Sequence, residues 1–264
     1  MANGEEKLQQ MSLWEHLDAL RSVLVKAVIV IVALMVVFFA LMPTIFDSVI
    51  LAPCRGDFCL YRLFESVTSW LPWIEPFQAQ GFEVHLINIQ LASQFFIHMS
   101  TSFWMALVVA FPILLYFIWT FIRPALYARE VRGVRTAFAF GTLMFFVGVA
   151  VGYFVVFPVT MRFLAEYQLS ELVPNQISLN SYMDTFVAML LVMGVVFELP
   201  LVAWALGAVG ALNRGFMRRY RRHAVVVLLI LAALITPTGD PFTLAIVFLP
   251  LYLLYELSIL CVKR

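Results

Sequence analysis

Residues 22–42 read SVLVKAVIVIVALMVVFFALM, a run of 21 residues in which Lys26 is the only charged side chain. About 20 predominantly apolar residues are enough to cross the hydrocarbon core of a bilayer as an α-helix. Lys26 lies near the start of the run, where its long aliphatic stem allows the ammonium group to reach the interface. This stretch therefore predicts a first transmembrane helix and makes the chain an integral membrane protein.

The composition of the whole chain agrees with that prediction. Of its 264 residues, 63% are hydrophobic and 12% are charged, whereas soluble domains are about 45–50% apolar and about 25% charged. These values exclude a water-soluble globular enzyme. The net charge of +1 excludes the strongly basic surface of a nucleic-acid-binding protein, and three cysteines are too few for a disulfide scaffold.

Five further apolar stretches complete the expected fold. They are residues 98–122, 136–161, 182–209, 224–235 and 242–262. The stretch 224–235 would extend over only about 18 Å, so we expect it to thin the bilayer locally or to lean on its neighbours. The expected fold class is an all-α integral membrane protein with six transmembrane helices. It forms a single membrane domain over residues 1–264, with an amphipathic cytoplasmic helix at 11–21 and an outer cap loop at 43–97.

The distribution of Lys and Arg gives the orientation in the membrane. An even number of spans puts both termini on one side, and that side collects 14 of the 17 basic residues. Only Arg55, Arg62 and Arg162 lie on the opposite side. Because cytoplasmic loops carry the excess of Lys and Arg, both termini are expected in the cytoplasm.

Two carboxylates lie inside the expected spans. Glu198 is deep in the fourth span, where an ionised carboxylate costs several kcal/mol, and such residues are functional candidates. The structural alternative is a protonated or hydrogen-bonded side chain within a helix contact. Glu256 is nearer the cytoplasmic end of the last span, where reaching the interface is easy. A structural role is therefore favoured for Glu256.

Three further acidic residues are candidates at the cytoplasmic face. Glu130 lies in a short, arginine-rich loop, where it either neutralises its neighbours or presents a carboxylate to a cationic ligand. Glu15 and Asp18 lie one turn apart on the amphipathic helix. Glu15 has capping-box spacing from Ser12 and thus a structural role already. Asp18 has no such role and is the better functional candidate.

Motifs for enzymatic chemistry are not evident. The sequence contains no Walker A run, no zinc-type His/Cys spacing and no nucleophile elbow, so we expect no enzyme, no cofactor and no metal. Cys54 and Cys59 share the outer loop, and a small disulfide and two free thiols are both open there. The alternative function is a proton-coupled secondary transporter of a small solute that uses Glu198. Such proteins commonly have internal repeats, and none is evident here.

Several short segments match the pattern of one family in order along the chain. They are HLDALR (16–21), AP (52–53), FPILLY (111–116), WTFIRPALYARE (119–130), YFVVFP (153–158), FELP (197–200), TP (236–237) and PLYLLYE (250–256). In these segments the chain, from about Met11 to its end, resembles the TatC family, the polytopic receptor subunit of the twin-arginine (Sec-independent) protein translocase.

The resemblance implies a fold, a function and partners. It implies six helices curved into a glove-like concave face in the bacterial cytoplasmic (inner) membrane. It also implies binding of the twin-arginine signal peptides of folded cargo proteins at the cytoplasmic face. Single-span subunits of the TatA/TatB type and further copies of the chain would assemble with it among membrane lipids. The proton-motive force would drive transport, with no cofactor and no nucleic acid.

The resemblance also implies roles for individual residues. Glu130 matches a signal-peptide-binding glutamate, and Phe121 matches a neighbouring aromatic of the same recognition loop. Glu198 matches an intramembrane glutamate, Pro53 an outer-loop proline, and Asp240 an outer aspartate in a register shifted by Gly239.

One position departs from the family pattern. Ala19 stands where family members often carry a glutamate, so the second carboxylate for the arginine pair is either Asp18 or Glu15.

Overall fold

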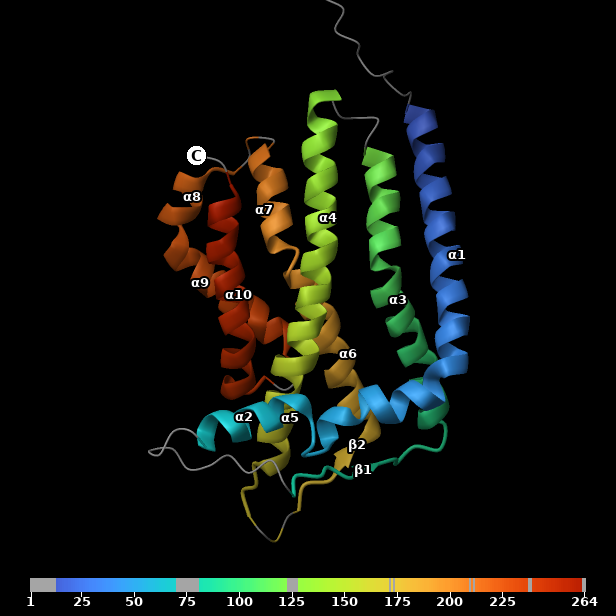
Figure 1. Ribbon diagram of the computed structural model, residues 1–264, viewed down its shortest axis with the longest axis vertical. Coiled ribbons are helices and arrows are strands. Elements are labelled where there is room, and N and C mark those ends of the chain that lie inside the picture. The colour runs from blue at the N-terminus through green and yellow to red at the C-terminus, as the bar shows by residue number, and fades with distance from the viewer. Residues whose placement is uncertain are drawn as a thin grey trace, which may run out of the picture.

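The fold is a set of long, roughly aligned helices with a small cap at one end (Figure 1). The computed structural model describes residues 13–69, 81–122, 128–170, 172, 174–208, 210, 212–236 and 239–262. The chain enters α1 and leaves α10 at the same end of the molecule (Figure 1), in agreement with an even number of crossings. We call this the inner end and the opposite end the outer end.

Ten α-helices carry the described part of the chain. They are α1 (Leu13–Ile45), α2 (Cys59–Ser69), α3 (Ser93–Ile122), α4 (Ala128–Val151), α5 (Phe157–Glu166), α6 (Leu179–Val196), α7 (Leu199–Ala208), α8 (Arg214–Arg219), α9 (Arg221–Ile235) and α10 (Pro241–Cys261). Three short helical turns, η1 (Phe46–Ile50), η2 (Ala52–Cys54) and η4 (Gly152–Val156), and two strands, β1 (Leu86–Ile87) and β2 (Ile177–Ser178), complete the described elements.

Within the described residues, five helical segments are long and apolar enough to cross a membrane. They are Leu17–Cys54, Ser93–Phe121, Ala137–Glu166, Leu179–Gly207 and Pro241–Cys261. The remaining expected span, the fifth at 224–235, corresponds to α9, which has only 15 residues. A helix of that length reaches about 22 Å, which is less than the hydrocarbon thickness of about 30 Å. The crossing made by α9 is therefore short, as the sequence indicates.

The third and fourth spans differ from the expected boundaries. The third is a longer rod, because α4, the π-helical turn η4 and α5 follow one another directly from Ala128 to Glu166. The fourth, expected as one helix over 182–209, is broken after Val196 and resumes at Leu199. Pro200 explains the break, since it lacks the N–H that a continuous helix would donate to the carbonyl of Val196.

The core of the molecule is built around α6. Its buried side chains include Tyr182, Phe186, Met189 and Met193, which pack against the end of α1 and against α4, α9 and α10. Across the molecule, α1 packs against α3, α3 against α4, α4 against α6, α6 against α9, and α9 against α10. The spans form a curved layer, with α1 at one edge and α9 and α10 at the other (Figure 1).

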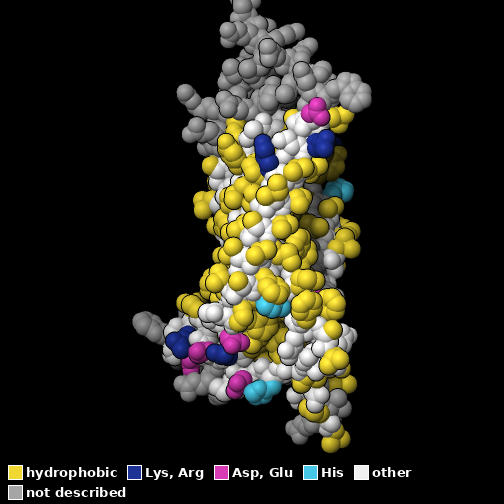
Figure 2. Space-filling model, turned by 90° about the vertical axis from the view of Figure 1, so that its right-hand side faces the viewer, with side chains coloured by type: hydrophobic (Ala, Val, Ile, Leu, Met, Phe, Trp, Pro, Cys, Tyr) yellow, Lys and Arg dark blue, Asp and Glu magenta, His cyan; other side chains and the backbone are white. Residues whose placement is uncertain are grey.

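The surface of the α1 edge matches a membrane environment. Figure 2 shows a broad hydrophobic belt on this face, with Lys, Arg, Asp and Glu confined to its two ends. The large apolar side chains of α1 are exposed along its length, for example Leu24, Val28, Val32 and Val36. Such a belt suits contact with lipid tails, which solvate apolar side chains as well as a protein core does.

The outer cap connects distant parts of the chain. After α1 the chain passes through η1 and η2 and enters α2, which runs across the ends of the spans (Figure 1). The strands β1 and β2 pair in parallel, with Leu86 opposite Ile177. Ser93 also hydrogen-bonds Asn180, and this contact joins the starts of α3 and α6. The cap thus fixes the outer ends of α1, α3, α5 and α6 to one another.

Candidate functional site

The inner end gathers the segments expected to bind a signal peptide. The first turns of α1, the end of α3 and the start of α4 lie at this end of neighbouring helices (Figure 1). Asp18 is exposed on α1, and Phe121 is half-buried near the end of α3. Glu15 lies in α1 and Glu130 in the first turn of α4, but their side chains are outside the described residues.

The expected amphipathic segment is not separate from the first span. From Leu13 onward it belongs to α1, which continues without a break to Ile45. A helix of 33 residues extends over about 50 Å, which exceeds the hydrocarbon core of about 30 Å. Asp18 therefore lies on a rigid extension of a transmembrane helix at the inner end.

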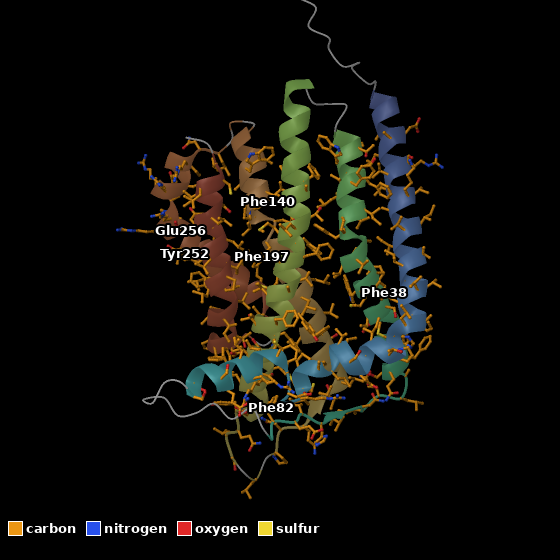
Figure 3. The ribbon with its side chains drawn as sticks, viewed as in Figure 1. Phe38, Phe82, Phe140, Phe197, Tyr252 and Glu256 are labelled. Atoms are coloured by element: carbon orange, nitrogen blue, oxygen red, sulfur yellow. The ribbon has the colours of Figure 1, made fainter. Side chains whose placement is uncertain are left out.

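The membrane interior holds Glu198 at the break between α6 and α7. Its backbone N–H donates to the carbonyl of Val195 at 3.0 Å, and its own carbonyl accepts from the N–H of Val202 at 2.9 Å. Both carboxylate oxygens are buried, and neither has a hydrogen-bond partner among the described residues. Phe197, the preceding residue, packs against α4 (Figure 3). The carboxylate thus lies in an apolar helix contact with its hydrogen-bonding capacity unused.

Glu256 has a different environment. One of its oxygens accepts from the Arg221 guanidinium at 2.6 Å and the other from the Tyr252 hydroxyl at 3.2 Å. Figure 3 shows Glu256 on the inner half of α10 and Tyr252 next to it, near the middle of the helix. A paired, hydrogen-bonded carboxylate has little unsatisfied capacity for a ligand. The structure therefore gives Glu256 a role in holding α9 against α10.

Pro53 lies in the outer cap, buried in η2. Its carbonyl accepts from the Tyr61 hydroxyl at 3.1 Å, and the same hydroxyl lies 3.0 Å from the carbonyl of Pro158. Burial raises the pKa of Tyr61, so its hydroxyl keeps the hydrogen that these contacts need. The Arg162 guanidinium lies 5.4 Å from the centre of the Tyr61 ring. Pro53 is thus anchored through one tyrosine to α2 and α5.

Asp240 has a local structural task. It is the N-cap of α10, and its side chain accepts from the N–H of Thr243 at 2.7 Å. Gly239, directly before it, has a φ of +61°, which a glycine adopts without strain. The shifted register at Gly239 therefore places a capping aspartate at the start of the last span.

The two outer cysteines differ in burial. Cys54 and Cys59 are both free thiols. Cys54 is buried in the core at the end of η2, whereas Cys59 is exposed at the start of α2. The turn between the two residues thus directs them into different environments.

Sequence reasoning missed several residues that hold the outer half together. The Tyr182 hydroxyl donates to the carbonyl of Ile50 at 2.5 Å, and the Tyr153 hydroxyl donates to the carbonyl of Val49 at 2.8 Å. Nε2 of His98 lies 2.8 Å from the carbonyl of Phe39. Polar side chains inside apolar spans were the available signal, because each needs a partner there.

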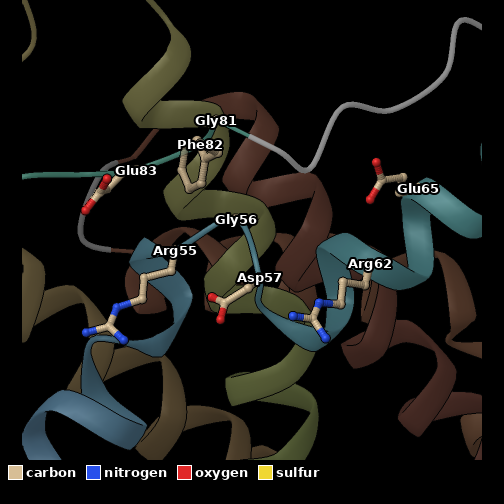
Figure 4. A pocket seen from close by; sticks show the side chains of 8 residues that line it. All are labelled: Arg55, Gly56, Asp57, Arg62, Glu65, Gly81, Phe82 and Glu83. Carbon is tan, nitrogen blue, oxygen red and sulfur yellow. The ribbon is translucent and has the colours of Figure 1, made fainter.

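A cavity of about 590 Å³ opens at the outer cap between α2 and the chain near Gly81. Arg55, Asp57 and Arg62 lie along it, and Glu65 and Glu83 complete its charged lining (Figure 4). None of these five side chains has an ion-pair partner within 4.0 Å among the described residues. The mixture of charge signs favours neither a simple anion nor a simple cation.

Comparisons with known proteins agree with this architecture. Residues 15–250 match the family model described as Sec-independent protein translocase protein (TatC). The chain is 32% identical over 251 residues to the TatC protein of Blattabacterium sp. subsp. Periplaneta americana, covering 95% of this chain and 94% of that protein. It is 34% identical over 255 residues to TatC of Deinococcus radiodurans, covering 96% and 86% of the two chains.

A solved structure has the same fold. It is the crystal structure of the twin-arginine translocase receptor TatC in DDM, with a TM-score of 0.74 and 25% sequence identity. The match covers 94% of this chain and 100% of that chain. Nothing in these comparisons supports a small-solute transporter. The helical architecture, the family match over most of the sequence and the solved structure agree, and the chain belongs to the TatC family of Sec-independent protein translocase proteins.

Proposed function

We propose that this chain is the receptor subunit of a twin-arginine protein translocase in the bacterial cytoplasmic membrane. In this proposal it binds the twin-arginine signal peptides of folded proteins at its inner end. The observation that carries the proposal is that α1 packs against α3, α3 packs against α4, and all three have their inner ends on the same side of the molecule (Figure 1). These are the three elements on which Asp18 or Glu15, Phe121 and Glu130 reside.

The chemistry of an arginine pair suits carboxylates in this place. A guanidinium group forms two parallel hydrogen bonds with a carboxylate, which makes the contact strong and directional. At an interface, two opposite charges about 4 Å apart attract by about 4 kcal/mol before the cost of desolvation. Lysine cannot reproduce the two-pronged geometry. We propose that Glu130 binds one arginine and that Asp18 or Glu15 binds the other.

Peptide binding to the purified chain tests this proposal. A twin-arginine peptide should bind in detergent or nanodiscs about tenfold or more tightly than the same peptide with two lysines. Glu130→Gln should lose most of that preference. Testing Asp18→Asn and Glu15→Gln separately identifies the second carboxylate, because only its loss should weaken binding. Equal binding of the two peptides to the unmodified chain would refute the proposal.

We propose a second role for the membrane interior. Glu198 accepts a hydrogen bond from a polar side chain on the membrane helix of a single-span TatA/TatB-type subunit. The unpartnered, buried carboxylate oxygens support this role, since unused hydrogen-bonding capacity in the membrane is costly. The complete translocase would contain several copies of this chain together with such subunits.

Export of a folded twin-arginine cargo in intact cells tests the role of Glu198. Glu198→Leu should abolish export, whereas Glu198→Gln, which keeps an acceptor oxygen, should retain part of it. Normal export by Glu198→Leu would rule out a functional carboxylate. The same assay tests the energy source, because an ionophore that collapses the proton gradient should stop export while cellular ATP remains.

A further inference from the structure

Gly141 faces Glu198 across the contact between α4 and α7. A Cβ atom at position 141 would lie 2.7 Å from Oε2 of Glu198 and 2.5 Å from Cδ2 of Leu201. Both distances are too short for carbon atoms in real structures, so no other residue type fits here without displacing a side chain. The missing side chain of Gly141 therefore creates the space that the Glu198 carboxylate occupies.

The Glu198 carboxylate is withdrawn into this space. Both of its oxygens are buried, although the residue as a whole is only partly buried. The part of Glu198 that reaches the surface is therefore not its carboxylate. An approaching helix cannot hydrogen-bond either oxygen while the carboxylate stays against α4, so the side chain must rotate out first.

We propose that Gly141 is a positioning residue for Glu198, and that it holds the carboxylate withdrawn until a polar side chain of a partner membrane helix draws it out. This inference rests on the proposed role of Glu198. The partner group is a hydrogen-bond donor, because a buried carboxylate oxygen accepts hydrogen bonds. The cost of a charged side chain within the membrane favours a neutral donor, such as a side-chain amide. Gly141 thereby sets the fraction of molecules in which the Glu198 carboxylate is accessible before the partner helix binds.

The other glycines of this contact show why Gly141 can be tested cleanly. At Gly148 a Cβ would lie 2.5 Å from the backbone carbonyl of Met193, so alanine would force α4 and α6 apart. At Gly141 the two nearest atoms are the ends of flexible side chains, which can move while the helices stay in place. At Gly152 the nearest atoms would lie 3.2 to 3.4 Å from the Cβ, a tight contact that a shift of a few tenths of an ångström relieves. Gly152→Ala is thus a matched control for Gly141→Ala.

The first experiment measures the accessibility of the carboxyl group directly. Dicyclohexylcarbodiimide, which dissolves in membranes and labels carboxyl groups in apolar surroundings, is added to the purified chain, and labelling of Glu198 is followed by mass spectrometry. Gly141→Ala should raise the labelling rate severalfold, and Gly152→Ala should leave it unchanged. Glu198→Gln gives the background. An unchanged or lower rate in Gly141→Ala, or an equal rise in both alanine variants, would overturn the positioning role.

The second experiment tests the partner chemistry with a defined probe. The probe is a synthetic single-span leucine helix with one glutamine at mid-depth, and an all-leucine helix is the control. Association in liposomes is measured by energy transfer. The glutamine helix should bind Gly141→Ala severalfold more tightly than the unmodified chain, with no such gain for the all-leucine helix. If labelling rises but glutamine gives no preference, positioning stands and the proposed role of Glu198 fails.

Discussion

Three tyrosine hydroxyls satisfy backbone carbonyls where the regular helices of the outer half end. Tyr61, Tyr153 and Tyr182 donate to carbonyls of the chain between α1 and α2. This segment contains a π-helical turn and a 3₁₀ turn, in which the usual α-helical hydrogen bonds are interrupted. An unpaired backbone group costs several kcal/mol near lipid. These three hydroxyls therefore stabilise the outer cap, because each removes the cost of an unpaired carbonyl.

Replacing Tyr61 with phenylalanine tests this at a single atom. The variant keeps the ring, which contacts both Arg162 and Phe82, but removes the hydroxyl that bonds the carbonyls of Pro53 and Pro158. The expected loss of stability is about 1–3 kcal/mol, the cost of leaving buried acceptors unpaired. Thermal unfolding in detergent measures the loss. Tyr167→Phe, at an exposed position, is the control and should change stability by less than about 0.5 kcal/mol.

The pH dependence of that difference follows from the pKa of Tyr61. Burial raises this pKa above its value in the unfolded chain, which is about 10. The unfolded state therefore releases its proton first as the pH increases, and the stabilisation from Tyr61 is complete below about pH 10 and lost above it. The stability difference between the unmodified chain and Tyr61→Phe should shrink on raising the pH through that value. A difference that stays constant would contradict a buried, protonated Tyr61.

Single positions differed in how far the sequence could predict them. Glu198 could be singled out because a carboxylate among about 20 apolar residues is conspicuous. The space at Gly141 that receives the Glu198 carboxylate could not be predicted, since glycines are common in membrane spans and only the structure shows which side chain faces each one. The capping role of Asp240 and the separate environments of Cys54 and Cys59 likewise depend on turn geometry.

The hydrogen bonding around Pro43 near the end of α1 is an example at the scale of an element. Pro43 lies inside α1 and lacks an N–H, so the carbonyl of Phe39 has no donor in its own helix. His98 of α3 lies with Nε2 2.8 Å from that carbonyl, and its ring stacks on Phe39 at 4.0 Å between centres. The nitrogen must carry a hydrogen to donate there. One side chain of α3 thus replaces the hydrogen bond that the proline removes from α1.

A double-mutant cycle tests this compensation. His98→Phe keeps a stacking ring and removes the donor, so it should cost about 0.5–1.5 kcal/mol of stability. In the Pro43→Ala background the same change should cost much less, because the alanine N–H can bond the carbonyl of Phe39 within α1. Thermal unfolding of the four proteins gives the coupling energy. Equal costs of His98→Phe in both backgrounds would mean that the contact does not compensate for Pro43.

Elements were predictable where local composition decides and not where tertiary contacts do. The apolar runs located the spans, and 242–262 differs by one residue at each end from α10 (Pro241–Cys261). The run 182–209 predicted one span, whereas its break at Phe197 and Glu198 is shown only by the structure. The pairing of β1 with β2 joins segments about 90 residues apart, as Leu86 opposite Ile177 shows, and no local pattern announces it.

At the scale of the whole molecule, the spans differ greatly in length. The 33 residues of α1 exceed a bilayer, whereas the 15 residues of α9 fall short by about 8 Å. The two helices lie at opposite edges of the curved layer (Figure 1). In a multi-pass protein of the cytoplasmic membrane built in this way, the helix is shorter than the hydrocarbon core at the α9 edge of the layer and not at the α1 edge. The lipid next to α9 must thin, at a cost of a fraction of a kcal/mol per Å.

This asymmetry predicts how stability depends on membrane thickness. In nanodiscs of myristoleoyl, oleoyl and erucoyl phosphatidylcholine, the unfolding temperature should fall as the bilayer thickens, because the mismatch at α9 grows. Inserting four leucines between Leu229 and Ile230 adds about one turn, or about 6 Å, and should flatten that dependence. The same insertion between Val36 and Val37 of α1 is the control, since α1 is already long enough. If lengthening α9 changes the dependence no more than lengthening α1 does, the short span is not what couples this protein to bilayer thickness.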